Sequence, residues 1–140
     1  MDKKPKVVKK AVIKKAQQPA TKDSVIFKTI IKAIQDKKGE RIVSLDLSNI
    51  EEAVADFFII CDAQSHIQVK AIADFVEEEV HKKCKERPYH SEAGQQWTLV
   101  DFVNIVVHVF QTEERKFYDI ESLWMDAPKE EHEEPVSEKK

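Results

Sequence analysis

An almost uninterrupted apolar run, Phe57-Phe58-Ile59-Ile60-Cys61, restricts the folding of this chain more than any other feature. The run is too short to cross a membrane, which takes about 20 residues, and its aromatic and β-branched side chains are typical of a strand. Successive side chains of a strand point to opposite faces of the sheet, so this strand needs apolar neighbours on both faces. We therefore expect residues 56–61 to form a central strand of a sheet that is covered on both sides.

Two segments have the pattern of helices that would cover such a sheet. The first follows a capping pair, Asp23-Ser24, and ends at Gly39. Its apolar residues recur with the spacing of one helix face, at Phe27, Ile30, Ile31 and Ile34. The second begins with a Ser-x-x-Gln capping box at residues 65–68 and ends before Pro88.

The remaining segments predict further strands and a short closing helix. β-branched or alternating patterns indicate strands at 41–47, 97–102 and 105–110, with an extended piece at 89–91. A last helical turn starts at Thr112. The apolar residues after this turn are expected to pack back on the sheet: Phe117, Tyr118, Ile120, Leu123 and Trp124. The order of elements predicts a single α/β domain with a mixed β-sheet flanked by helices.

Charge divides the chain into three parts. Residues 1–20 contain seven lysines and one aspartate, whereas residues 22–128 contain 13 basic and 20 acidic residues. We interpret residues 1–21 as a flexible lysine-rich arm, residues 22–128 as the folded domain and residues 129–140 as an acidic disordered tail. The acidic body suits a basic partner, and the arm suits an acidic partner such as RNA. The alternative is that both charged parts serve only solubility.

Several kinds of site are excluded by residues that the chain lacks. Two glycines, Gly39 and Gly94, are too few for a dinucleotide-binding turn or a Walker A phosphate loop. The histidines show no metal-ligand spacing, and we expect no metal, no cofactor and no small-molecule substrate. The lysine-rich start lacks the apolar core of a secretory signal. Cys61 and Cys84 are expected to be free thiols in the cytoplasm, the latter with a pKa lowered by neighbouring lysines.

Residues with a catalytic pattern are few. Asp46 and Asp101 stand near strand ends, where α/β enzymes place catalytic acids, but nothing in the sequence brings them together. Ser65 is explained by its capping role. His108 lies among apolar residues of a strand, where a half-buried, hydrogen-bonded histidine is favoured over a catalytic base. The chain is therefore interpreted as a binding protein rather than an enzyme.

Two tryptophans are candidates for a partner-binding site, because tryptophan dominates the energetics of many interfaces. Trp97 stands at the entrance to a strand, and Trp124 follows the last helical turn. Position alone leaves open whether Trp97 anchors a partner or plugs the edge of the core. For Trp124 it favours the core.

Three blocks of sequence have a specific combined spacing. They are Ala55–Cys61 with Gln68–Asp74, Asp101-Phe102 with Val106–Phe110, and Glu114–Trp124 with Asp126-Ala127-Pro128. Together they resemble the ribosomal silencing factor family, also called Iojap-like, over residues 23–128. The chain departs from the family's pattern at two turns, Ala63-Gln64-Ser65 and Val103-Asn104, where the family has glycine. A glycine lost from a turn that needs a positive φ costs about 1 kcal/mol.

The resemblance implies a nucleotidyltransferase-like outline and an activity of binding rather than catalysis. It implies that the chain binds the large ribosomal subunit at ribosomal protein fourteen and sterically blocks the small subunit, which represses translation. Ribosomal RNA is an expected contact of the lysine-rich arm. One alternative is a nucleotidyltransferase-like enzyme that uses Ser65 and Asp46 or Asp101 with magnesium. Another is a homodimeric adaptor without ribosome contact, paired through the apolar stripe of the first helix or through the Trp97 strand.

Seven residues form the predicted partner-binding site. Trp97 is the expected aromatic anchor. The others are expected to form a polar rim, to order it or to brace the last segment: Asp101, Glu114, Arg115, Tyr118, Trp124 and Asp126. For Arg115 and Tyr118 a purely structural role in capping and packing is an equal alternative.

Overall fold

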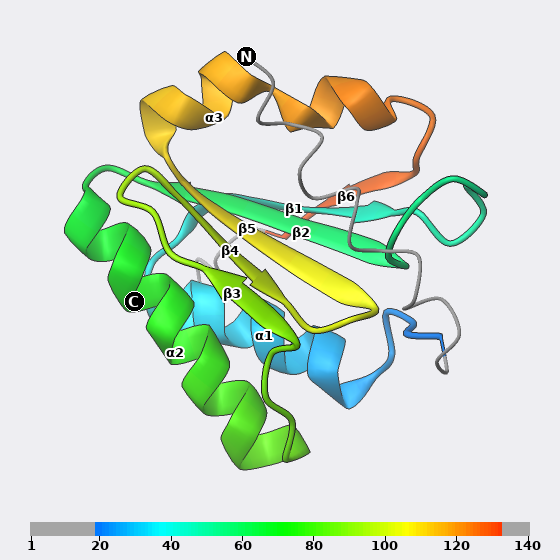
Figure 1. Ribbon diagram of the computed structural model, residues 1–140, viewed down its shortest axis with the longest axis horizontal. Coiled ribbons are helices and arrows are strands. Elements are labelled where there is room, and N and C mark those ends of the chain that lie inside the picture. The colour runs from blue at the N-terminus through cyan, green and yellow to red at the C-terminus, as the bar shows by residue number, and fades with distance from the viewer. Residues whose placement is uncertain (1–18, 133–140) are drawn as a thin grey trace, which may run out of the picture.

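The apolar run forms the central strand that its composition predicts. Strand β2 (Phe57–Ala63) is buried along its whole length and lies inside a six-stranded sheet with the order β3-β4-β5-β2-β1-β6 (Figure 1). The computed structural model describes residues 19–132. Its other strands are β1 (Glu40–Asp46), β3 (His90–Glu92), β4 (Trp97–Asp101), β5 (Ile105–Gln111) and β6 (Lys129–Glu131). β2 pairs in parallel with β5 and antiparallel with β1, which confirms the predicted mixed sheet in a single α/β domain.

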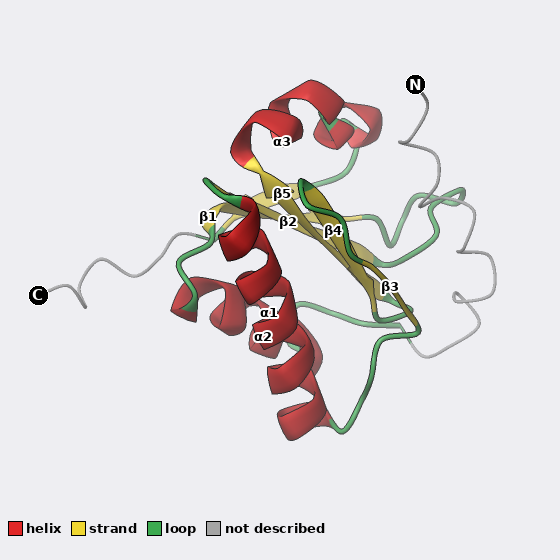
Figure 2. Ribbon diagram, turned by 60° about the vertical axis from the view of Figure 1, so that its left-hand side comes forward, coloured by secondary structure: helices red, strands yellow, loops and turns green. Residues whose placement is uncertain are grey.

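Helices α1 (Val25–Asp36) and α2 (His66–Cys84) cover one face of the sheet (Figures 1 and 2). Ser65 caps α2 as predicted, because its Oγ accepts a hydrogen bond from the N–H of Gln68 at 3.2 Å. The apolar stripes of both helices are buried in a largely aliphatic first core. The predicted use of the α1 stripe as a dimer surface is therefore wrong. Among residues 19–132, no helix combines the length and apolar composition that crossing a bilayer requires.

A shorter segment covers the opposite face of the sheet (Figure 1). It consists of helix α3 (Thr112–Tyr118) and the 3-10 helix η3 (Ile120–Trp124). We call these two helices, residues 112–124, the cap. Tyr118, Ile120 and Trp124 pack from the cap into a second core on this face, as predicted.

Two apolar residues of the cap point away from the sheet. Phe117 is 73% exposed and Leu123 is 53% exposed, so the prediction that both pack on the sheet is wrong. Neighbouring residues of an α-helix are rotated by about 100° around its axis. A short helix that turns Tyr118 toward the sheet therefore turns Phe117 away.

The folded part of the chain is longer than predicted at both ends. Ala20, assigned to the flexible arm, is buried, and its N–H donates a hydrogen bond to Oδ2 of Asp56 at 2.9 Å. Residues 129–131, assigned to the disordered tail, form β6, which pairs antiparallel with β1. A charged edge strand has no apolar alternation to reveal it. The remaining parts of the predicted arm and tail, residues 1–18 and 133–140, lie outside the described residues.

Both cysteines are free thiols, and burial dominates their acidity. It raises the pKa of the Cys61 thiol to about 12. Cys84 packs partly buried against the first core, and burial raises its pKa as well. The predicted lowering of the Cys84 pKa by neighbouring lysines is wrong, because desolvation of the thiolate outweighs their charge.

Candidate functional site

An aromatic layer lies between the sheet and the cap. The ring of Trp97 stacks on Phe110 of β5 with centroids 4.7 Å apart, and it lies 4.9 Å from the ring of Tyr118. Trp124 meets Phe58 of β2 edge to face, with centroids 5.8 Å apart. Three predicted partner-binding residues, Trp97, Tyr118 and Trp124, are thus partly buried and pack against the second core on one face of the sheet.

Trp97 is also fixed by a hydrogen bond to His108. The indole Nε1–H donates to Nδ1 of His108 at 3.2 Å, so this imidazole nitrogen is the acceptor and the ring proton is assigned to Nε2. Burial lowers the pKa of His108 to about 3, and the ring is neutral. His108 is fully buried rather than half-buried, and its Nε2 has no hydrogen-bond partner among residues 19–132. The tryptophan therefore closes the edge of the second core.

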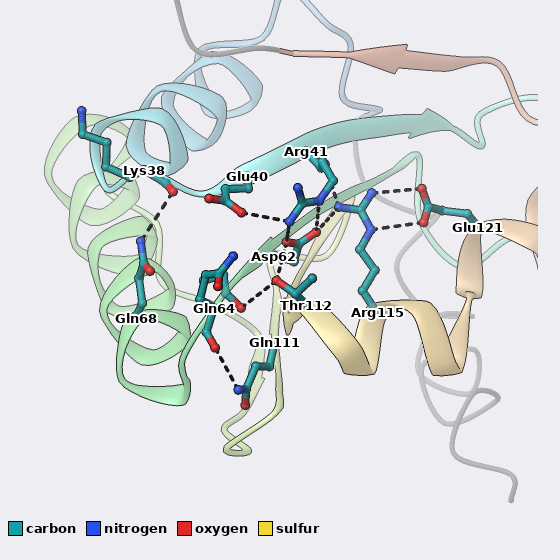
Figure 3. Close-up of polar contacts among 11 residues, drawn as sticks. Lys38, Glu40, Arg41, Asp62, Gln64, Gln68, Gln111, Thr112, Arg115 and Glu121 are labelled. Atoms are coloured by element: carbon teal, nitrogen blue, oxygen red, sulfur yellow. Dashed lines mark hydrogen bonds and ion pairs between the residues drawn. The ribbon is translucent and has the colours of Figure 1, made fainter.

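A buried ion network holds the start of the cap to the sheet (Figure 3). Asp62, near the end of β2, has a side chain that is only 1% exposed. Its carboxylate accepts hydrogen bonds from Nη1 of Arg115 at 2.9 Å, from Oγ1 of Thr112 at 2.9 Å, and from Nε and Nη2 of Arg41. Burial alone raises the pKa of Asp62, but the hydrogen bonds from these donors outweigh it, so the pKa lies below its ordinary value.

Arg115 joins this network to the second half of the cap. Its Nε and Nη2 donate to the two carboxylate oxygens of Glu121 in η3, at 3.2 and 3.0 Å. Its Nη1 donates to the main-chain oxygen of Arg41 at 2.7 Å in addition to Asp62. The planar guanidinium matches the carboxylate of Glu121 in a fork geometry, whereas Asp62 accepts a single hydrogen bond from it. Arg115 is only 10% exposed. Its contacts fit the purely structural role that the sequence left open as the alternative to partner binding.

Arg41 takes its place in the network through an unusual backbone. Its φ is 48°, in the left-handed region, next to an irregularity in the β1–β2 register. A non-glycine residue in that region costs about 1–3 kcal/mol, which the charge-assisted hydrogen bonds to Asp62 offset. Sequence reasoning missed Arg41, Asp62 and Glu121. The available signal was an aspartate placed inside a buried apolar strand.

The network occupies the end of the parallel strands β2 and β5, where many α/β proteins bind ligands. Ser65 lies just beyond this end, whereas Asp46 and Asp101 pair opposite Phe57 and Val106, at the other end of the same strands. The length of β2 separates the two ends by about 20 Å. The alternative catalytic set therefore does not come together. Within residues 19–132, no three His, Cys, Asp or Glu side chains are grouped to hold a metal ion.

The remaining predicted partner-binding residues lie in two places, Asp101 at the far end of the sheet and the other two on or beside the cap. Asp101 is buried at the far end of β4 from Trp97, and its Oδ1 accepts a hydrogen bond from the N–H of Val103 at 2.8 Å. Asp126 is exposed in the loop between η3 and β6, and Glu114 is partly exposed on α3. The seven predicted residues thus do not form one contiguous site.

Exposed apolar side chains mark the outer side of the cap and the loop that follows it. Phe117, Leu123 and Met125 are 73%, 53% and 77% exposed. Exposed acidic residues flank them along the chain: Glu113, Asp119 and Asp126. Sequence reasoning assigned the first two apolar residues to the core and missed Met125. The available signal was the pairs Phe117-Tyr118 and Leu123-Trp124, since a short helix turns only one member of such a pair inward.

Comparison with known proteins adds four likenesses. The family model described as "Ribosomal silencing factor during starvation" matches residues 18–140. Ribosomal silencing factor RsfS of Bacillus subtilis is 41% identical over 106 residues, covering 74% of this chain and 87% of that protein. Ribosomal silencing factor RsfS of Halalkalibacterium halodurans is 38% identical over 104 residues, covering 74% and 88%. A crystal structure of a protein from Chromobacterium violaceum matches with a TM-score of 0.66 at 37% identity, covering 71% of this chain and 82% of that chain.

Proposed function

The chain belongs to the ribosomal silencing factor family, and from this premise we propose that it binds the large ribosomal subunit in the cytoplasm. The proposed partner there is ribosomal protein fourteen. The bound chain sterically blocks association of the small subunit and thereby represses translation. Family membership supports ribosome association and silencing, and the partner and the steric mechanism are what the proposal adds.

The outer side of the cap is the proposed docking surface. Apolar side chains that remain exposed on a folded domain are typical of interaction sites. Phe117, Leu123 and Met125 provide three of them within nine residues of chain. This exposure is the observation that carries the choice of surface, because the other apolar side chains of the cap are buried in the second core or pack against it.

Charge supports a basic protein as the partner. The docking surface carries the exposed carboxylates of Glu113, Asp119 and Asp126, and residues 22–128 contain 20 acidic against 13 basic residues. Opposite charges accelerate association and disfavour wrong partners more than they add affinity. A salt-sensitive association rate is therefore expected for docking on a basic ribosomal protein.

The seven predicted residues take different parts in this proposal. Glu114 and Asp126 are retained as rim contacts, since both are at least partly exposed. The aromatic residues Trp97, Tyr118 and Trp124 support the cap from beneath. The remaining two residues have structural roles. Arg115 holds the cap through the ion network, and Asp101 accepts a hydrogen bond from the main chain of the turn that follows it.

The test compares two double variants in co-sedimentation with bacterial large ribosomal subunits. Phe117→Ala with Leu123→Ala removes apolar atoms from the docking surface. Val25→Ala with Ile67→Ala removes side chains that are 64% and 70% exposed at the helices of the opposite face. We expect the first pair to weaken binding by about 2 kcal/mol, roughly 30-fold, and the control pair by less than about twofold. Subunits of Bacillus subtilis are suitable, because its silencing factor is 41% identical.

Subunit joining tests the steric mechanism separately. Light scattering should show that large subunits saturated with this chain no longer join small subunits, and that the Phe117→Ala, Leu123→Ala variant blocks joining poorly at the same concentration. Equal binding losses for the two double variants would contradict the docking surface. Full joining in the presence of saturating chain would contradict steric blocking.

We also propose that the lysine-rich arm contacts ribosomal RNA near the docking surface. Its support is charge alone, with seven lysines and one aspartate in residues 1–20. A deletion that tests this contact should stop at residue 18, because Ala20 is part of the first core. The shortened chain should bind large subunits more weakly and with a shallower salt dependence. An unchanged salt dependence would contradict the contact.

A further inference from the structure

The charges of this chain are separated along its length far more than its net charge of -3 suggests. Residues 1–38 contain 12 lysines and three aspartates, whereas residues 39–140 contain 11 basic and 23 acidic residues. The positive part therefore continues past the predicted arm as far as residue 38, since residues 19–38 contain five lysines and two aspartates. A positive segment on an otherwise acidic domain is a distinct electrostatic feature.

A groove runs between α1 and the end of β6. It is a shallow hollow, open to solvent, with a volume of about 400 Å³. Lys28, Lys32 and Gln35 line it from α1, with the i, i+4, i+7 spacing of one helix face. The buried side chains of Phe27 and Ile31 form the apolar part of its lining. The remaining lining residues are Lys22, Glu130 and His132.

An ion pair closes one side of this groove. Nζ of Lys22 lies 3.0 Å from Oε1 of Glu130, and both side chains are largely exposed. An exposed pair of this kind contributes about 1 kcal/mol or less, so an anion of higher charge can replace the carboxylate. The groove then presents the ammonium groups of Lys22, Lys28 and Lys32 to that anion.

We propose that this groove is an RNA-binding site that holds the phosphate backbone of a short single-stranded or bulged segment. Lysines neutralise phosphates without reading bases, which matches a groove whose cationic side chains are all lysines. The sequence has seven further lysines before residue 19, and so many positive charges suit a polymer of phosphates rather than a single anion. That the RNA is ribosomal rests on the proposed function. Binding of RNA to the groove can be measured without ribosomes.

The first test measures binding of the full chain to a fluorescein-labelled uridine 12-mer by fluorescence anisotropy at several salt concentrations. Lys28→Gln with Lys32→Gln changes the groove, and Lys82→Gln with Lys83→Gln makes the same charge change on α2. Each pair also removes ion pairs within its own helix, to the exposed Asp36 or to the largely buried Glu79. We expect the groove pair to weaken binding at least fivefold and to reduce the salt slope by about 1.4, and the α2 pair to weaken it less than twofold.

The second test uses substitutions expected to strengthen binding. Glu130→Gln frees Lys22 from its competing carboxylate, whereas Glu131→Gln removes the same charge from the next residue of β6, which is not part of the groove. We expect Glu130→Gln to tighten RNA binding two- to fivefold, clearly more than Glu131→Gln. Equal tightening by both would show that only net charge matters and would overturn the site.

The remaining outcomes separate this site from the docking surface. All substituted side chains are exposed, and urea unfolding checks that each variant is folded. Equal losses for the groove pair and the α2 pair, or no loss for either, would overturn the RNA-binding groove while leaving subunit binding through the cap untouched. The Phe117→Ala, Leu123→Ala variant should keep its full affinity for the 12-mer even where it loses the large subunit. A loss of RNA binding in that variant would overturn the assignment of RNA to the groove.

Discussion

The two faces of the sheet are covered by different means. On the first face, helices of 12 and 19 residues bury a largely aliphatic core. On the second face, a helix of seven residues and a 3-10 helix of five cover a core rich in aromatic rings. The second covering is attached through the carboxylate of Asp62 and the guanidinium of Arg115, and the first has no comparable buried ion pair among the described residues.

The difference shows how a small domain can keep apolar side chains exposed on one of its faces. Burial of apolar area is non-directional, so long helices are stabilised wherever their apolar stripe fits. A short cap buries little area, and directional ion pairs set its position instead. Because Arg115 and Glu121 hold the cap from its inner side, Phe117 and Leu123 remain on its outer side. The proposed docking surface therefore depends on the ion network.

The largest effect is expected from breaking that network with Arg115→Ala. The substitution leaves the buried Asp62 with fewer donors and leaves Glu121 without its fork partner. Removing one partner of a buried ion pair costs about 3–5 kcal/mol, and we expect a loss near the lower value in the free energy of unfolding, measured by urea denaturation.

An exposed ion pair on the first face provides the control for this prediction. Lys70→Ala removes the pair between Lys70 and Asp74 on α2, whose atoms are 2.9 Å apart. It should cost less than about 0.5 kcal/mol. Similar losses for Arg115→Ala and Lys70→Ala would mean that the cap is not held by its charges.

We expect acid to have an intermediate effect on the free energy of unfolding, and this effect should come from the second face. The pKa of His108 is about 3 in the folded chain, whereas an unfolded histidine titrates near its ordinary value of about 6.5. Below that value the unfolded chain binds a proton that the folded chain excludes, so the free energy of unfolding falls by about 1.4 kcal/mol per pH unit. Between pH 6.5 and 5 the loss should reach about 1.6 kcal/mol, because the unfolded histidine is already half protonated at pH 6.5.

The pH dependence of urea unfolding checks this prediction, with His108→Gln as the matched variant. Glutamine keeps an acceptor for the indole N–H of Trp97 and cannot titrate, so the slope between pH 6.5 and 5 should be much smaller. A smaller slope remains from His132, whose pKa burial also lowers. Asp62 does not add to the slope between pH 6.5 and 5. Its pKa is lowered in the folded chain, so the stability that it contributes is lost only when the pH falls below the ordinary pKa of an aspartate. An unchanged slope in His108→Gln would contradict the assignment.

The first face was predictable from sequence because its covering follows periodicity. The apolar run in β2 and the stripe of α1 each report burial through spacing alone, and both predictions are confirmed. β6 was not predictable in this way, since its three residues are charged and their pairing with β1 is a long-range event. The prediction for Ala20 was wrong for the same reason, because its hydrogen bond joins it to Asp56, which is 36 positions away in the sequence.

The second face was only partly predictable, because directional contacts decide it. Trp97, Tyr118 and Trp124 were predicted as partner-binding residues, and in the structure all three are partly buried and pack against the second core. Nothing in local spacing shows that Arg41 and Arg115 converge on Asp62, since these residues come from β1, α3 and β2. The exposure of Phe117 and Leu123 depends on how this ion network orients the cap, so the sequence did not predict it either.

The smallest effect is expected from Val103→Gly, in the turn that joins β4 to β5. Val103 has a φ of 83°, and a β-branched residue is strained at positive φ. Glycine adopts this conformation without strain and keeps the N–H that donates to Asp101. We expect a gain of about 1 kcal/mol in the free energy of unfolding by urea. Lys85→Gly, at the unbranched left-handed residue after α2, should gain less.

Hydrogen exchange in Val103→Gly separates the two faces more finely than unfolding does. Amides of β2 and β5 that exchange only through global unfolding should gain the full stabilisation, because the substitution acts on the whole domain. Amides of the cap that exchange by local opening should gain nothing, since the turn at Val103 lies at the far end of β5 from the start of α3. A full gain in the cap as well would mean that it opens only together with the sheet. The two faces would then differ in the kind of contact that stabilises them but not in cooperativity.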